Sequence, residues 1–215
     1  FLAEHDVAIA GEYNSAESQK RLSFFVNCGE PLPGYEIEIR DELDRVLPER
    51  HCGKLFVRGP SVMQGYFGDN GITREVLSQD GWLNTGDLAY RVGETLVIAG
   101  RVKDMIIING RNIWPQDLEF LADRQPEIRN ACAVSIPGKH GTELAVLLIE
   151  SRNNNPDVRD NLVKHLKGLV HKEIGIECKI ELVPRNCIPR TTSGNLARSA
   201  MRTEYLNRIA AHTEG

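Results

Sequence analysis

The stretch GRVKDMIIINGRNIWPQDLE, residues 100–119, decides the fold of this chain. Its continuous apolar run over residues 105–108 predicts a buried strand. Asn109 and Gly110 then form a turn signal. Pro115 suits the first turn of a helix, where its missing N–H would have no partner anyway. The stretch therefore predicts a strand, a tight turn and a helix in close succession.

The residues after this stretch continue the alternation of strands and helices. At the end of the stretch itself, Asp117 and Glu119 lie near the positive end of the expected helix, where carboxylates are favoured. Apolar periodicity then predicts strands 131–136, 143–150 and 179–183, a helix over 156–172 and a terminal helix from about residue 196. The order β-α-β-β-α-β with a final helix predicts a compact α+β domain.

The residues before Arg101 have a different character. Residues 36–40 alternate between polar and apolar side chains, and further short strand signals end at glycine or proline, at residues 55–57 and 94–98. We therefore expect a β-rich subdomain over residues 1–100 and a small α+β domain over residues 101–215.

Composition excludes several classes of protein. The chain has 215 residues, 41% hydrophobic and 26% charged, which is ordinary for a globular protein. The net charge of −4 has both signs interspersed, so it favours neither nucleic acid nor an anionic membrane surface. No apolar run approaches the roughly 20 residues that a membrane-spanning helix needs.

The five cysteines point to no metal site. Their number is odd and no two have CxxC spacing, so the sequence suggests neither zinc ligands nor a disulfide framework. Reduced thiols in a cytoplasmic protein are the simpler interpretation.

Four stretches carry a family resemblance, in their content and in their order. They are GKLFVRGPSVMQGYF (53–67), GWLNTGDLAY (81–90), the stretch 100–119 and PRTTSGNLAR (189–198). Together they resemble the later core motifs of the adenylate-forming superfamily, which includes acyl-CoA synthetases, fatty acyl-AMP ligases, luciferases and peptide-synthetase adenylation domains. The segment GRNIWPQDLE (110–119) is most similar to fatty acyl-AMP ligases.

The resemblance implies a two-step reaction. ATP and a fatty or other carboxylic acid give acyl-AMP and pyrophosphate, with Mg²⁺ accompanying the ATP. The acyl group then passes to a thiol, either that of CoA or the phosphopantetheine arm of an acyl carrier protein, and the likeness to fatty acyl-AMP ligases favours the carrier protein.

The resemblance also assigns roles to three residues near the expected boundary. It places Asp87 and Arg101 on the AMP ribose, because a carboxylate accepts from a diol and a guanidinium offers fixed donors. Taken alone, each would be read as a surface residue. The resemblance makes Lys103 the hinge about which the small domain rotates between the two half-reactions.

The fourth stretch departs from the family pattern. The family has lysine after Thr-Ser-Gly, and this chain has Asn195. The family lysine stabilises charge that develops as the carboxylate attacks phosphorus, and asparagine supplies donors without charge. Three interpretations stay open: an inactive variant, a degenerate paralogue, or a substituting cation, for which Arg190 and Arg198 are nearest in sequence.

The early phosphate-binding loop of the family does not occur in this sequence. We therefore expect the chain to be the last part of the large domain plus the small domain, inactive alone, with residues 1–27 a candidate for the end of the insertion typical of fatty acyl-AMP ligases. Two functions of other classes compete with the ligase: an adenylate-binding pseudoenzyme and a module that docks a carrier protein without catalysis.

Overall fold

The computed structural model describes residue 8 and residues 25–138 and 141–213. Most of the candidate insertion segment 1–27 lies outside these residues. The chain divides into two compact units, Phe1–Lys103 and Asp104–Gly215, each of which is described by itself. Within the described residues, no helix is both long and apolar enough to cross a membrane.

The first unit is built on a four-stranded antiparallel sheet. Its strands follow one another in sequence order: β1 (Glu36–Arg40), β2 (Gly53–Arg58), β3 (Leu83–Val92) and β4 (Thr95–Arg101). The alternation in β1 directs Ile39 to one face, where it is buried with Leu55 and Ala89 of the next two strands. The strand predicted over residues 36–40 is confirmed.

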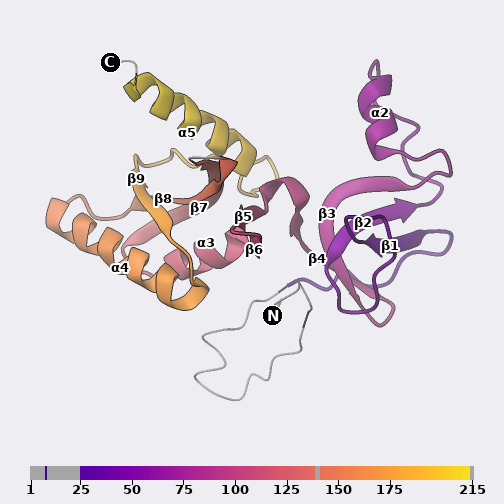
Figure 1. The fold of residues 1–215 in the computed structure, drawn as a ribbon, viewed down its shortest axis with the longest axis horizontal. Coiled ribbons are helices and arrows are strands. Elements are labelled where there is room, and N and C mark those ends of the chain that lie inside the picture. The colour runs from indigo at the N-terminus through magenta and orange to yellow at the C-terminus, as the bar shows by residue number, and fades with distance from the viewer. Residues whose placement is uncertain (1–7, 9–24, 139–140, 214–215) are drawn as a thin grey trace. The chain divides into compact units, whose positions relative to one another are not determined.

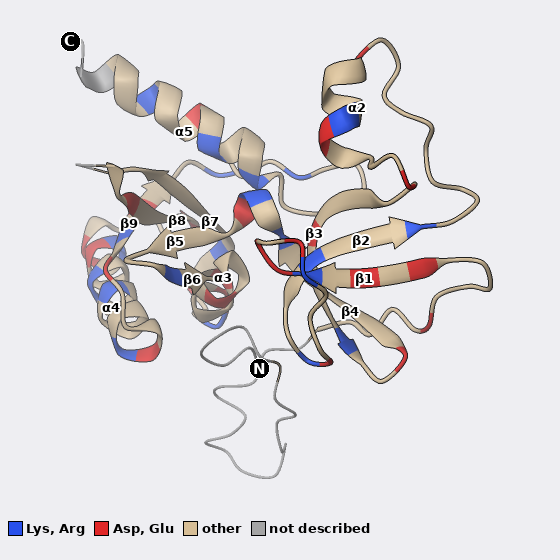
Figure 2. Ribbon diagram, turned by 45° about the vertical axis from the view of Figure 1, so that its right-hand side comes forward, with Lys and Arg blue, Asp and Glu red and all other residues tan. Residues whose placement is uncertain are grey.

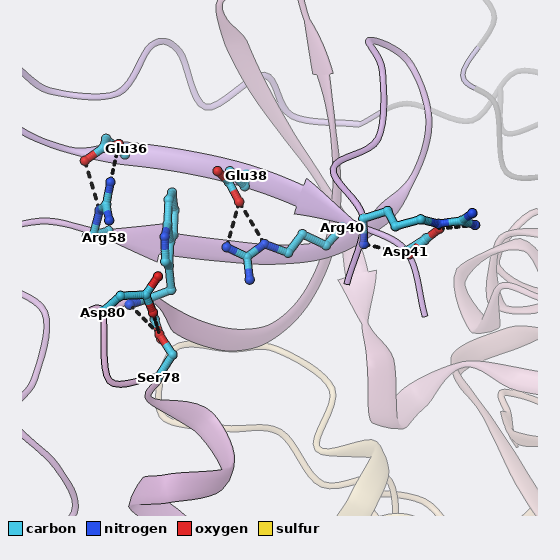
Figure 3. A network of polar contacts seen from close by, with 9 residues as sticks. Glu36, Glu38, Arg40, Asp41, Arg58, Ser78 and Asp80 are labelled. Carbon is cyan, nitrogen blue, oxygen red and sulfur yellow. Dashed lines mark hydrogen bonds and ion pairs between the residues drawn. The ribbon is translucent and has the colours of Figure 1, made fainter. Parts of the chain in front are cut away.

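The other face of this sheet carries a network of charged side chains, among them Glu36, Glu38, Arg40 and Arg58 (Figure 3). The guanidinium of Arg40 lies 5.1 Å from the Trp82 ring centroid, and that of Arg58 lies 4.7 Å from it. Glu38 and Glu36 accept hydrogen bonds from these two arginines, respectively. Both cations thus stack against the indole, and Trp82 is only 4% exposed.

The first unit also contains a short helix, α2 (Asn70–Val76), that the sequence did not predict. Asp69 caps it, accepting a 2.9 Å hydrogen bond from the Ile72 N–H. The helix buries none of its residues, so it has no apolar stripe that periodicity could reveal.

The second unit opens with a tight hairpin. Its strands β5 (Ile106–Ile108) and β6 (Arg111–Ile113) pair antiparallel, joined by Asn109 and Gly110 with φ of 51° and 75°. Positive φ at both turn residues suits the right-handed twist of the strands and favours an Asn-Gly pair. The predicted strand and turn are confirmed, whereas β6 was not predicted.

A three-stranded sheet forms the centre of the second unit. Strand β8 (Glu143–Ser151) lies between β7 (Ile128–Pro137), which is antiparallel to it, and β9 (Cys178–Val183), which is parallel. Helix α4 (Pro156–Ile174) makes the crossover that parallel pairing requires. The buried Trp114 precedes helix α3, which spans Pro115–Asp123 and starts at the predicted proline.

Helices cover both faces of this sheet (Figure 1). Leu147 and Ile149 of β8 join the core formed with α3 and α4, whereas Val146 and Leu148 face the core that contains Met201 of α5 (Arg198–Thr213). The central strand is therefore apolar on both sides, and the predicted α+β fold is confirmed.

Candidate functional site

The two residues expected at the ribose lie side by side in the first unit. Asp87 and Arg101 are direct partners on β3 and β4, and the Arg101 Nε lies 2.7 Å from the Asp87 Oδ1. Gly86 has a φ of 72°, a left-handed conformation in which a residue with a side chain would be strained. The Asp87 N–H donates to Thr85 Oγ1, whose hydroxyl donates to Leu55 O. Thr85 thus holds Asp87 in place, a role that the sequence did not predict.

This pair has the chemistry that a ribose diol needs. A carboxylate has two oxygens and about four acceptor positions, so pairing with Arg101 leaves Asp87 able to accept further hydrogen bonds. The side chain of Asp87 is 20% exposed and that of Arg101 is 54% exposed, so an approaching hydroxyl can reach both. The ribose role remains a prediction.

Lys103 lies where the chain passes from the first unit to the second. It is exposed within the short 3-10 turn η1 (Val102–Asp104), and it is the last residue of the first unit. An exposed residue at such a position can absorb a change in backbone dihedrals with little loss of packing. Lys103 thus lies where a hinge could act, and its hinge role stays a prediction.

Asn195 lies on a tight exposed loop of the second unit. The Thr191 N–H donates to Asn195 O over 2.8 Å, and the Asn195 N–H donates back to Thr191 Oγ1 over 3.1 Å. Gly194 closes the turn with a φ of 84°. The Asn195 amide nitrogen donates to Ser193 Oγ over 3.2 Å, so residue 195 presents a neutral polar group to solvent.

Of the two arginines nearest to Asn195, one is already engaged. Arg198 makes a two-pronged contact with Glu119, at 2.9 Å from Nε to Oε1 and 2.6 Å from Nη2 to Oε2. Arg198 is therefore already paired with a carboxylate, and whether it substitutes for the family lysine stays a prediction. Burial raises the pKa of Glu119, and Arg198 opposes that rise. Glu119 thus binds a partner across the fold, beyond the helix-end role expected from sequence.

The arginine at the start of the loop lies in a more open place. Arg190 is exposed, and its Nη1 donates to Gly194 O over 2.9 Å. Arginine residues recur along the loop and helix α5 (Figure 2). Arg190 is thus a cation that touches the loop itself.

No group of three or more metal-ligating side chains occurs in the part of the chain that the structure describes. All five cysteines are described, and none of them forms a disulfide. Burial raises the pKa of the Cys132 and Cys178 thiols to about 12, which keeps both of them neutral near pH 7.

The sequence matches known ligases over most of its length. The family model described as AMP-binding enzyme matches residues 7–67. A protein named as an acyl-CoA synthetase in Caulobacter vibrioides is 42% identical over 90% of this chain and 34% of its own length. The medium-chain-fatty-acid–[acyl-carrier-protein] ligase JamA of Moorena producens is 31% identical over 89% of this chain and 34% of its own length.

With these matches, the resemblance to AMP-forming, adenylate-forming acyl ligases is confirmed. Among solved structures, one from a study of fatty acyl-adenylate ligases of E. coli and L. pneumophila has a TM-score of 0.80 and 38% identity. It covers 95% of this chain and 36% of that protein. The chain is therefore similar to fatty acyl-adenylate ligases in particular, and it spans about a third of the length of the relatives it matches.

Proposed function

We propose that this chain is the adenylate-binding portion of an ATP-dependent ligase that activates a fatty acid. The observation that carries the proposal is the Asp87–Arg101 pair, held on adjacent strands in a chain that matches AMP-binding enzymes. In the reaction, a carboxylate oxygen attacks the α-phosphorus of ATP and pyrophosphate leaves. The product is an acyl-AMP, whose ribose hydroxyls would bind Asp87 and Arg101.

The cofactors and the acceptor follow from this chemistry. Mg²⁺ would be carried by the ATP phosphates, where it screens their charge during displacement. The acyl group then moves from AMP to a thiolate, forming a thioester and releasing AMP. The named activity of JamA supports an acyl carrier protein as the acceptor, with CoA as the other thiol. The predicted cytoplasmic location is part of this proposal.

Asn195 supports a second candidate, an adenylate-binding pseudoenzyme. Residue 195 offers a neutral amide where related enzymes are expected to offer a positive charge, and a charged donor to phosphate is roughly twice as strong as a neutral one. Such a protein would bind acyl-AMP without forming it. A carrier-docking module without catalysis would do neither.

ATP–pyrophosphate exchange on the full-length protein, with a fatty acid present, separates these candidates. Exchange supports the ligase, whereas binding of a non-hydrolysable acyl-AMP analogue without exchange selects the pseudoenzyme. If the protein neither catalyses exchange nor binds the analogue, the docking module is the remaining candidate.

The Asp87→Asn variant tests the nucleotide site. Removing the charge should raise the KM for ATP about ten- to a hundredfold, because hydrogen bonds to charged groups contribute roughly 1.5–3 kcal/mol. Glu94→Gln is the matched control, since Glu94 also pairs with an arginine of the same sheet, Arg91, at 2.8 Å. An unchanged KM in Asp87→Asn would refute the ribose role.

A further inference from the structure

The far end of the Asn195 loop is tied to the interior of the second unit. Glu119, on α3, receives the two-pronged contact from Arg198 and accepts a 3.0 Å hydrogen bond from the Ala133 N–H of β7. The Arg198 Nη1 also lies 3.5 Å from Asp104 Oδ2. The side chains of Arg198 and Glu119 are only 17% and 8% exposed, so water screens this contact little.

The near end of the loop is tied to a different buried carboxylate. Glu150, on β8, is fully buried and accepts hydrogen bonds from the Ile188 N–H over 3.0 Å and the Asn130 Nδ2 over 2.8 Å. Arg190 continues the series: its Nη2 lies 3.4 Å from Asn130 Oδ1, while its Nη1 donates to Gly194 O. A chain of polar contacts therefore leads from the sheet interior to the loop tip.

We propose that Arg190 and Arg198 are positioning residues that together hold loop 191–197 in one conformation. The loop tip is exposed and packs few apolar groups, so the short hydrogen bonds within the loop would not by themselves restrict it to one conformation. Arginine suits this task because its planar fork fixes two partners at once. This proposal rests on the proposed function, because residue 195 lies at the family's lysine position and such a residue must be preorganised toward the reacting phosphate.

The proposal gives Arg190 a task that differs from supplying charge. If Arg190 replaced the family lysine as a cation, lysine at position 190 would preserve its role. If Arg190 acts by position, lysine fails, because an ammonium group lacks the fork that reaches Gly194 and Asn130 together.

Hydrogen–deuterium exchange of the full-length Arg190→Lys protein tests whether Arg190 anchors loop 191–197, and this test needs no enzyme activity. Amide exchange in peptides covering residues 190–197 should become roughly two- to tenfold faster, the effect of losing about one hydrogen bond. The control is Arg185→Lys, since Arg185 is exposed and donates to Arg152 O near the same loop. Wild-type exchange rates in the loop of Arg190→Lys would overturn the proposal.

Kinetics then test what the anchor is for. Arg190→Lys and Arg198→Lys should both slow ATP–pyrophosphate exchange by at least about fivefold, a modest part of the roughly 10²-fold that a 1 Å misplacement costs. Thioester formation from added acyl-AMP should keep its rate, whereas general unfolding would slow both steps. Unchanged adenylation in Arg190→Lys would overturn the proposal. A wild-type protein without exchange activity would refute the proposed ligase, while the deuterium result would still decide the anchor.

Discussion

Replacing Asn195 with lysine should increase acyl-adenylate formation by about tenfold. The free energy lost with the asparagine side chain is small, because that side chain makes an exposed 3.2 Å hydrogen bond to Ser193 Oγ. Such hydrogen bonds contribute about 0.5–1.5 kcal/mol. The backbone contacts with Thr191 do not depend on the side chain. The gain is larger, since a preorganised donor at a developing charge is worth roughly 2.7–4 kcal/mol. Subtracting the largest cost from the smallest gain leaves about 1.2 kcal/mol, close to tenfold in rate.

The assay is ATP–pyrophosphate exchange with the full-length protein, compared with single-turnover transfer from acyl-AMP to the thiol. Asn195→Met is the matched control, because methionine has nearly the reach of lysine without its charge. Only the lysine variant should gain adenylation, and thiol transfer should barely change. If the asparagine protein already exchanges as fast as the lysine variant, the reasoning is refuted and another cation acts. Arg190 would then be the residue to replace, since Arg198 is engaged with Glu119.

Two further predictions concern the hinge and the buried thiols. Lys103→Pro should slow thioester formation more than adenylation, because proline fixes φ near −65° and would hamper rotation, and equal loss in the two half-reactions would argue against a hinge. Burial raises the pKa of Cys178 to about 12 from an ordinary 9.0, so its stability contribution is complete below pH 9 and is lost as the pH rises towards 12. Between about pH 8 and 10.5, the free energy of unfolding measured in urea should fall by roughly 2 kcal/mol more in the wild type than in Cys178→Ala. Equal falls in the two proteins would contradict the raised pKa of Cys178.

The elements that sequence predicted well are those with strong periodicity. Helix α4 buries Leu162, Leu166 and Val170 along one stripe, as its spacing predicts. The glycine and proline signals located the hairpin turn and the start of α3. Strand β3 was harder to predict, because a polar stretch around Gly86 interrupts its alternation and its pairing with β4 shifts register after Leu88.

The candidate site was predictable only in part. The motifs named Asp87, Arg101 and Asn195, and the structure brings the first two into contact. The partnership of Glu119 with Arg198 joins residues 79 positions apart, and no local pattern reports such a contact. Its formation depends on the packing of α3 and α5 against the same sheet, which the sequence alone did not show.

The two tryptophans of the chain lie one in each unit, and both are buried: Trp82 beneath the stacked arginines and Trp114 ahead of α3. Indole emission shifts to longer wavelength when the ring becomes hydrated, so each unit contains its own optical reporter. Substituting phenylalanine for one tryptophan leaves the other to record a single unit during unfolding. Fluorescence can therefore show whether the two units melt together or in succession, without any attached dye.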